Sequence, residues 1–318
     1  MDWKAKWIWH EARGGAQNYY LCARKVFNVQ ENIKKADLHI TADSRYVVWI
    51  NDKRIGQGPI RSWPFAYHYD SYDLSHLLKP GENVIAVLGM HYGVGTFQYL
   101  PNPGGILAQI EMEDVDGEKH YVCTDRSWKL MHNPAYDSRT PRICCQQAWV
   151  EHYNANYDPE GWKDDPELDN SCWYEAKEIG PAGCEPWTNL VPRPIPFLTE
   201  EPMYPVSVIR SRLVKPPEQI WALNLRPNLM PHDIQANRMP LCGFLATTVK
   251  VNEKQKVTLK QQTSGVRGRL RVNGVDVQKT GDYQSRWAGG TNGTFELEPG
   301  ENLLLWNVTG NYHEWSIS

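Results

Sequence analysis

Residues 48–55 read Val-Trp-Ile-Asn-Asp-Lys-Arg-Ile, and residues 79–87 read Lys-Pro-Gly-Glu-Asn-Val-Ile-Ala-Val. A similar pattern returns near the other end of the chain, as Leu-Arg-Val-Asn-Gly-Val-Asp-Val at 270–277 and Glu-Pro-Gly-Glu-Asn-Leu-Leu-Leu-Trp at 298–306. Asn-Asp and Asn-Gly tolerate the positive φ of a two-residue hairpin turn, and Pro-Gly marks a corner before the apolar strand that follows. The repeat therefore predicts two copies of one β-module rather than a single enzyme core.

The overall composition is that of an ordinary globular protein. The chain has 318 residues, of which 41% are hydrophobic and 22% charged, so it is long enough for two domains with their own cores. Its formal net charge of −3 gives no reason to expect a nucleic-acid partner. Because no stretch has the apolar length of a membrane span and the N-terminus has no signal-peptide core, we expect no membrane partner either.

Cysteine usage favours a reducing compartment. The chain has seven cysteines, an odd number, and no Cys-x-x-Cys pair that would hold zinc. Together with the absence of an export signal, this pattern predicts a cytoplasmic protein with reduced cysteines and no metal site.

β-strand signals dominate the chain. Residues 46–50 are β-branched and aromatic, and residues 84–88 form a continuous apolar run. Residues 106–113 lead through an Asp-Gly turn to a returning strand at 120–123. Sustained helical periodicity is absent. We therefore predict an all-β protein made of two β-sandwich domains in tandem.

A proline-rich stretch marks the expected domain boundary. Prolines crowd residues 181–217, and such a segment favours extended geometry with few contacts across it. We place the first domain at 1–198 and the second at 199–318. The first is the larger because residues 7–9 and 127–129 both read as strand edges that belong to it.

No motif of a catalytic centre is found. Glycoside hydrolysis needs two carboxylates held apart across a cleft, but the acidic patches at 111–116 and 164–165 read as a solvated strand face and a polar loop. A Gly-x-Ser-x-Gly motif is absent, and the glycine-rich residues 89–95 lack the lysine and the following helix of a phosphate-binding loop. We therefore assign no catalytic residue.

The richest candidate binding surface runs from Gly58 to Asp73. It combines aromatic side chains with an arginine, two aspartates and several hydroxyls. Aromatic rings stack on the apolar faces of a pyranose, while charged groups fix its hydroxyls. The candidate carbohydrate contacts in this stretch are Arg61, Trp63, Tyr67 and Asp70. The alternative is a long crossover that covers the end of the sandwich with its own aromatic side chains.

Two further candidates lie in the glycine-rich loop. His91 and Tyr92 follow the strand at 84–88 and are included as candidate carbohydrate contacts, although His91 also fits the description of a packed loop histidine. No cofactor is expected. Carboxylates and carbonyls at the rim of a sandwich could hold Ca²⁺, but no specific calcium motif supports it.

Short motifs follow one another in an order typical of one enzyme family. They are Trp-Ile-Trp (7–9), Ala-Arg-Lys-Val-Phe (23–27), Ala-Asp-Ser-Arg-Tyr (42–46), Gly-Pro-Ile-Arg-Ser (58–62), Tyr-Asp-Ser-Tyr-Asp-Leu (69–74), Gly-Glu-Asn-Val-Ile-Ala-Val (81–87), Glu-His-Tyr-Asn-Ala-Asn (151–156), Gly-Trp (161–162), Leu-Asp-Asn-Ser-Cys-Trp (168–173) and Pro-Trp (186–187). As an ordered set they resemble the N-terminal, non-catalytic region of bacterial α-L-rhamnosidases of glycoside hydrolase family 78. The resemblance is good over residues 1–200, and the remainder resembles a second accessory sandwich of the same enzymes. Asn154-Ala155-Asn156 departs from the Asp-Ala-Arg of the family, so we transfer no role of that carboxylate and guanidinium.

The resemblance implies galactose-binding-like jelly rolls that, in the full enzymes, precede an (α/α)₆ barrel with two catalytic carboxylates. This chain has no run of amphipathic helices that could form such a barrel. We therefore predict an inactive N-terminal portion of a rhamnosidase, a fragment or truncated product. Its expected partners are a rhamnose-containing carbohydrate and the C-terminal catalytic domain of the parent enzyme. The alternatives are a stand-alone carbohydrate-binding protein, the accessory domains of a family 2-like glycosidase, and sandwiches that only pack against another chain.

Overall fold

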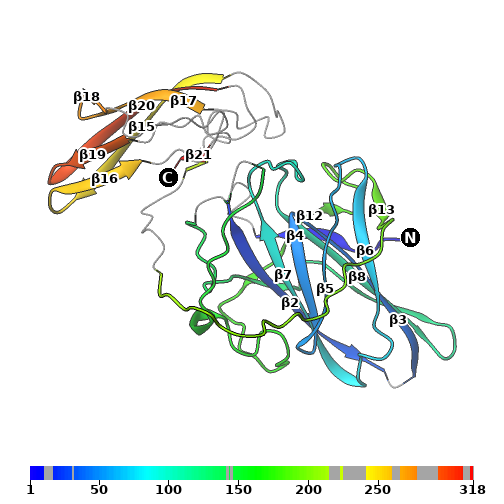
Figure 1. The fold of residues 1–318 in the computed structure, drawn as a ribbon. Coiled ribbons are helices and arrows are strands. Elements are labelled where there is room, and N and C mark those ends of the chain that lie inside the picture. The colour runs from blue at the N-terminus through cyan, green and yellow to red at the C-terminus, as the bar shows by residue number, and fades with distance from the viewer. Residues whose placement is uncertain are drawn as a thin grey trace.

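The computed structural model describes residues 1–10, 17–30, 32–140, 143, 146–214, 223–224, 241–259, 266–277, 293–310 and 316–317. The described strands fall into two sets, one within residues 6–192 and one within residues 223–317 (Figure 1). The described residues contain no α-helix, and their single 3₁₀ turn is η1 (Ala155–Tyr157). The prediction of an all-β protein is confirmed.

The first set forms two facing sheets. Its strands are β1 (Lys6–Trp9), β2 (Tyr19–Val29), β3 (Ile33–Asp43), β4 (Arg45–Ile50), β5 (Lys53–Gly58), β6 (Tyr67–Asp73), β7 (Gly81–His91), β8 (Gly105–Asp114), β9 (Lys119–Cys123), β10 (Lys129–His132), β11 (Tyr174–Glu175), β12 (Lys177–Pro181) and β13 (Leu190–Pro192). One sheet has the order β12-β1-β8-β3-β6-β13, with β9 paired to β8, and the other has the order β11-β10-β2-β7-β4-β5. All pairs are antiparallel except β13 with β6. The hairpin expected around residues 106–123 is the β8–β9 pair.

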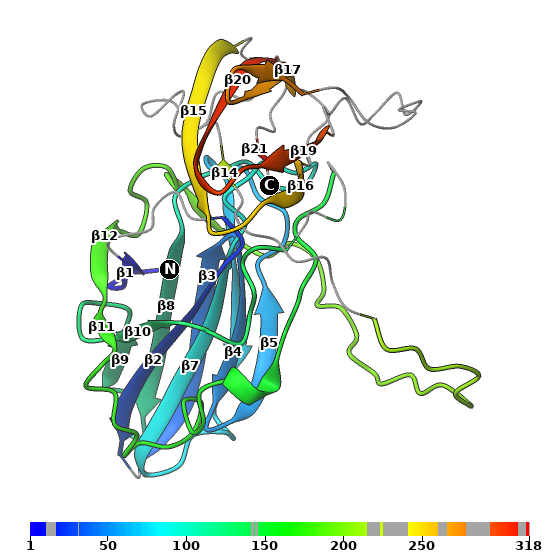
Figure 2. The ribbon, with the colours of Figure 1, turned by 90° about the vertical axis from the view of Figure 1, so that its left-hand side faces the viewer.

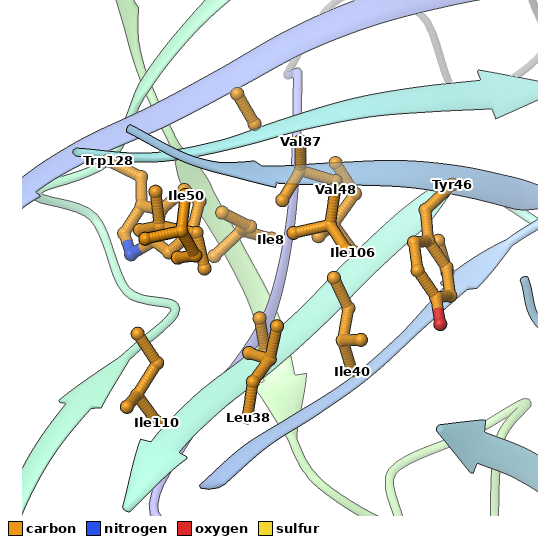
Figure 3. Packing of buried hydrophobic residues seen from close by; sticks show 14 of the residues in the cluster. Ile8, Leu38, Ile40, Tyr46, Val48, Ile50, Val87, Ile106, Ile110 and Trp128 are labelled. Atoms are coloured by element: carbon orange, nitrogen blue, oxygen red, sulfur yellow. The ribbon is translucent and has the colours of Figure 1, made fainter. Parts of the chain in front are cut away.

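The main core lies between these two sheets. Alternate residues of β3 and β8, such as Leu38 and Ile110, meet alternate residues of β4 and β7, such as Val48 and Val87, and all four are almost fully buried (Figure 3). This period of two is the pattern of a strand with one face in the core. Removal of these aliphatic side chains from water provides most of the driving force for the fold.

Aromatic side chains from the late part of this unit cover the outer faces of both sheets. Trp187 stacks on Trp7 at a centroid distance of 3.9 Å, and both rings are fully buried. Trp162 packs edge-on against Trp49 of β4 at 5.6 Å. With β13 paired to β6, residues up to 192 therefore belong structurally to the first sandwich, which explains its size.

The repeated motif forms a buried asparagine clasp in the first sandwich. Asn51 and Asp52 have φ values of 50° and 64°, as the hairpin turn between β4 and β5 requires. Asn51 Nδ2 donates to Asn83 Oδ1 at 2.8 Å, and Asn51 Oδ1 accepts from the amide of Val84 at 2.9 Å. Asn83, which is fully buried, also closes the Pro-Gly corner through the carbonyl oxygen of Lys79 at 2.6 Å. The two parts of the motif are thus bonded to each other.

The second copy repeats this clasp. Its strands and those around it are β14 (Leu223–Asn224), β15 (Leu241–Val251), β16 (Gln255–Leu259), β17 (Val266–Val272), β18 (Val275–Asp276), β19 (Gly293–Leu297), β20 (Gly300–Gly310) and β21 (Ser316–Ile317). Asn273 donates to Asn302 Oδ1 at 2.9 Å and accepts from the amide of Leu303 at 2.8 Å. Asn302 is fully buried and bonds the carbonyl oxygen of Glu298 at 2.7 Å. The prediction of one β-module used twice is confirmed at the level of individual hydrogen bonds.

The second set has its own small core. A four-stranded sheet has the order β15-β20-β17-β18, and β16 pairs with β19. Leu270, Leu297 and Trp306 are buried between these elements. The domain boundary at 198/199 remains a prediction.

Candidate functional site

A pocket of about 360 Å³ opens at one end of the first sandwich. The start of β4, the β5–β6 connection and the β7–β8 connection meet there, and residues 143 and 146–151 close one side. Its lining residues are Tyr20, Ser44, Arg45, Pro59, Ile60, Arg61, Ser62, Tyr67, Met90, Tyr92, Thr96, Gln98, Tyr99, Leu100, Asn102, Ile143, Gln146, Gln147, Ala148, Trp149 and Glu151. Loops at the end of a sandwich are held by the rigid sheets behind them, so they can form a site without weakening the core.

Aromatic rings form much of the pocket wall. Tyr92 and Tyr99 meet edge to face at a centroid distance of 5.3 Å. The indole Nε1 of Trp149 donates to the carbonyl oxygen of Tyr92 at 2.9 Å, which ties the closing segment to the β7–β8 connection. The wall therefore presents apolar ring surface, and hydrogen bonds and ring contacts hold these rings in place. Small-molecule sites commonly have such a lining.

Tyr20 brings a buried hydroxyl to the pocket. Its side chain is 3% exposed, and its ring stacks on Tyr136 at 3.9 Å with an interplanar angle of 8°. The hydroxyl has no hydrogen-bond partner among the residues that the structure describes. Burial raises the pKa of this hydroxyl, and the charge of Glu151 raises it further, so the group stays neutral. The hydroxyl oxygen itself is shielded from solvent. Since an unpaired buried hydroxyl costs free energy, it would gain from a ligand hydroxyl or carbonyl that came within hydrogen-bond distance.

A buried carboxylate fixes a second wall. Asp43 is 1% exposed and lies at the end of β3. It accepts hydrogen bonds from the hydroxyl of Tyr99, from Asn102 Nδ2 at 3.1 Å and from Trp187 Nε1 at 2.9 Å. Burial raises the pKa of Asp43 to about 6, against the opposing effect of these hydrogen bonds. Tyr99 and Asn102 both line the pocket, so the hydrogen bonds to Asp43 fix the positions of these two side chains in the pocket wall.

Three charged side chains stand at the pocket. Arg45, Arg61 and Glu151 line it and are exposed. None of them forms an ion pair with another described residue. Within the described part of the chain, the charges of these three side chains are therefore not neutralised by an ion pair.

The structure brings three of the six sequence-predicted contacts into the pocket, namely Arg61, Tyr67 and Tyr92. Tyr67 is 3% exposed and donates its hydroxyl to the carbonyl oxygen of Ala42 at 3.2 Å. Trp63 lies beside the pocket rather than in it. Its ring is 47% exposed, stacks near Phe65 at 6.1 Å and lies 5.8 Å from the guanidinium of Arg61. Trp63 and Arg61 border a smaller hollow of about 30 Å³, and Arg61 and Tyr99 line both this hollow and the pocket.

Asp70 and His91 lie inside the sandwich and do not line the pocket. Asp70 is fully buried and is held by Arg193, whose Nε and Nη2 atoms donate at 2.5 and 3.1 Å, and by the hydroxyl of Tyr46. The His91 ring packs against Trp9 at 5.9 Å, and burial lowers its pKa to about 4, so it is neutral at physiological pH. Asp70 thus has its oxygens engaged in the fold, and His91 matches the packed-histidine alternative.

Sequence reasoning missed several residues of the pocket and its wall, namely Tyr20, Asp43, Tyr99 and Trp149. Residues 42–46 form one of the family motifs, but nothing in that motif indicates that it borders a site. Tyr99 lies four residues beyond the glycine-rich loop at 89–95, so a wider window around that loop would have included it. No sequence signal distinguishes Tyr20 from its neighbours in β2.

One group of side chains has the composition of a metal site. Asp114, Glu118 and His120, at the β8–β9 turn, each place one ligand atom within 4.8 Å of the others. The carboxylate of Asp114 already accepts from the amides of Asp116 at 3.0 Å and Glu118 at 2.8 Å, and from His120 Nε2 at 3.2 Å. This geometry is that of an aspartate that closes a turn.

Among the described residues, no helix is long and apolar enough to cross a membrane.

Comparison with known proteins gives consistent matches. The family model of the α-L-rhamnosidase N-terminal domain matches residues 31–208, and that of α-L-rhamnosidase domain D2 matches residues 219–318. The chain belongs to the α-L-rhamnosidase family. The expected resemblance to the N-terminal region of these enzymes, followed by a second accessory domain, is confirmed.

Named relatives agree with this assignment. The α-L-rhamnosidase of Streptomyces avermitilis is 24% identical over 237 residues, and one from Formosa agariphila is 28% identical over 190 residues. These matches cover 71% and 51% of this chain but only 21% and 20% of the relatives. The solved family 78 rhamnosidase of Bacillus sp. GL1 is 37% identical, with a TM-score of 0.70, over 100% of this chain and 33% of that enzyme. The chain therefore spans a fifth to a third of the length of these relatives.

Proposed function

We propose that this chain is the accessory part of an α-L-rhamnosidase and that the pocket at the end of the first sandwich binds a rhamnose-containing saccharide. The observation that supports this most directly is the pocket itself. It joins tyrosine and tryptophan rings, two arginines without ion pairs among the described residues, and the unpartnered hydroxyl of Tyr20. Family membership and the names of the relatives point to rhamnose as the sugar.

The chemistry of the lining suits a 6-deoxy sugar. A pyranose presents an apolar ring face to aromatic side chains and a rim of hydroxyls to donors and acceptors. Tyr92 and Tyr99 supply ring surface, while Arg61, Glu151 and Tyr20 supply polar groups. Rhamnose also carries a methyl group, for which the side chains of Ile60 and Met90 provide apolar contacts in the same pocket. Exposed Trp63, beside the pocket, offers a face for a second sugar unit.

The single carboxylate in the described lining of the pocket favours binding over hydrolysis. Glycosidic cleavage uses two carboxylates on opposite sides of the scissile bond. Among the described lining residues, Glu151 is the one with a carboxylate, and nearby Asp43 is buried with both oxygens hydrogen-bonded. We assign the catalytic step to a part of the parent enzyme outside this chain.

Calorimetric titration of the chain with L-rhamnose tests this proposal. A single sugar in an open pocket is expected to bind with a Kd on the order of 0.1–1 mM. Tyr20→Phe should weaken binding about three- to tenfold, because one hydrogen bond is worth about 1 kcal/mol. Arg61→Ala should weaken it at least as much.

Two matched substitutions serve as controls. Tyr174→Phe and Arg126→Ala change exposed side chains at β11 and the β9–β10 connection, neither of which lines the pocket, and should leave the Kd unchanged. Absence of heat with rhamnose and with rhamnosyl disaccharides at ten millimolar would remove the binding role. Equal weakening by the control substitutions would show that the loss is not specific to the pocket.

A further inference from the structure

Residues 203–214 form an exposed apolar segment that has no counterpart elsewhere in the described chain. Seven large apolar side chains there are at least 79% exposed: Met203, Tyr204, Val206, Val208, Ile209, Leu213 and Val214. The segment has no helix or strand, and it makes no backbone hydrogen bond to the described residues. Figure 2 shows it as a yellow-green loop that projects away from the first sandwich. Isolated exposed apolar residues are ordinary, but a continuous set of this size indicates an interaction surface.

The chain that leads into this segment is anchored. Arg193 is bound to buried Asp70, and its guanidinium lies 4.5 Å from the ring centroid of Phe197. Phe197 stacks on Tyr72 of β6 at 4.9 Å, and Glu200 forms an ion pair with Arg54 of β5. The chain is therefore held against the β5 and β6 side of the sandwich up to residue 200. The seven apolar side chains of residues 203–214 follow this anchor in the sequence.

The sequence of the segment suits pairing as an added strand. Residues 206–214 read Val-Ser-Val-Ile-Arg-Ser-Arg-Leu-Val, which is rich in β-branched residues, and their peptide groups lack ladder partners among the described residues. Unpaired peptide groups with apolar side chains are what a sheet edge or groove of another domain recognises. Arg210 and Arg212 are exposed and form no ion pair with described residues. The surface that binds this segment is therefore expected to be apolar, with carboxylates placed to pair with the two arginines.

We propose that residues 203–214 dock on the catalytic part of the parent rhamnosidase, the part that this chain does not contain. The length of the relatives supports this occupant, because the chain matches only a third of the Bacillus sp. GL1 enzyme and a fifth of two other rhamnosidases. The segment also runs into residues 209–218, which lie between the two family matches and belong to neither. A second copy of this chain fits less well. Antiparallel self-pairing about Ser211 would set Arg210 opposite Arg212 of the other copy, and like charges directly opposite are unfavourable.

This inference is independent of the sugar pocket, and trypsin provides its test. The segment contains two cleavable bonds, after Arg210 and after Arg212. The 318-residue chain is compared with a hybrid in which it replaces the matching N-terminal third of the Bacillus sp. GL1 rhamnosidase. Cleavage after these arginines, followed by mass spectrometry, should be at least about tenfold slower in the hybrid, as burial of the segment requires. The triple variant Val206→Ser, Val208→Ser and Ile209→Ser should return the hybrid to the rate of the chain alone.

A matched triple variant controls for a general loss of apolar surface. Val115→Ser, Val275→Ser and Leu303→Ser change side chains that are 66%, 70% and 48% exposed and lie elsewhere, so they should leave the protection intact. Hydrolysis of 4-nitrophenyl α-L-rhamnoside reports that the hybrid is folded. Equal cleavage rates in an active hybrid would overturn the proposal. So would protection of the 318-residue chain that rises with its own concentration, which would assign the segment to self-association.

A second measurement covers the case of an inactive hybrid. The solved Bacillus sp. GL1 enzyme is superposed on this chain, and the exposure of the residues that match 203–214 is calculated with and without the rest of that enzyme. Most of the positions that match the seven apolar side chains should become buried by residues beyond the matched third. If they stay exposed there, the docking assignment is wrong.

Discussion

Replacing Asp70 by asparagine tests whether this carboxylate serves the fold or a ligand. Its side chain is fully buried, and the Arg193 side chain that binds it is 10% exposed. The neutral amide would leave the guanidinium without its counter-charge in a largely dry site. Breaking a buried pair in this way costs about 3–5 kcal/mol, and the slight exposure of Arg193 favours the lower end, about 3 kcal/mol.

Urea denaturation of the chain measures this loss. With a typical slope of about 1–3 kcal/mol per molar urea, the midpoint of the first sandwich should fall by about 1–3 M. The double variant Asp70→Asn/Arg193→Met should recover at least half of the loss, because it removes the uncompensated charge as well. Asp276→Asn is the matched control: Asp276 pairs with Arg271 at 2.9 Å but both side chains are 50% exposed, so the expected cost is below about 1 kcal/mol. Unchanged stability of Asp70→Asn together with lost rhamnose binding would refute the structural role.

Two further predictions concern the clasp and the buried carboxylate near the pocket. Asn83→Ala and Asn302→Ala should each lower the free energy of unfolding of their own sandwich by about 2–4 kcal/mol, because each leaves several buried donors and acceptors unpaired. Denaturation with a fluorescence probe in each sandwich measures this loss. If only one of the two substitutions destabilised its sandwich, the two clasps would not be equivalent. For Asp43, whose pKa is raised to about 6, the folded state binds a proton more tightly than the unfolded state. Its contribution to stability is therefore fully present below about pH 4, falls as the pH rises, and by about pH 7 has decreased by about 3 kcal/mol. The difference in unfolding free energy between the native chain and Asp43→Asn, measured from about pH 4 to 7, should follow this slope, and a flat difference would show that Asp43 is ionised throughout.

The hairpins and corners could be predicted from the sequence because each depends on local chemistry. Asn-Asp, Asn-Gly and Pro-Gly restrict the backbone wherever they occur, so the turn at Asn51 and the corner before Asn83 were both expected. The hydrogen bond between them could not be, since the two asparagines are 32 residues apart and only the folded sheet brings them together.

The candidate site shows the same limit. An aspartate among aromatic residues reads as a ligand contact, but Asp70 is neutralised by Arg193, 123 residues later in a proline-rich stretch. The apolar run ends at Leu88, so the sequence predicts that His91 lies in a loop. In the structure β7 continues to His91, and the period of two that points Ile85 and Val87 into the core carries His91 there as well. Tyr20 lines the pocket only because the β5–β6 connection, the β7–β8 connection and residues 146–151 pack together around it. No local sequence pattern predicts that packing.

The paired clasps also bear on how such a module can diversify. Each clasp closes a long interval of chain, 32 residues between the asparagines in the first sandwich and 29 in the second. Because the ends are bonded to each other, lengthening the interval adds only a slowly growing closure entropy, about 0.6 kcal/mol per doubling. In the first sandwich this interval contains β5, β6 and the pocket residues around Arg61. A recognition loop between the two asparagines can therefore be lengthened or exchanged without changing the hydrogen bonds of the clasp. The sheets that position the loop then stay the same.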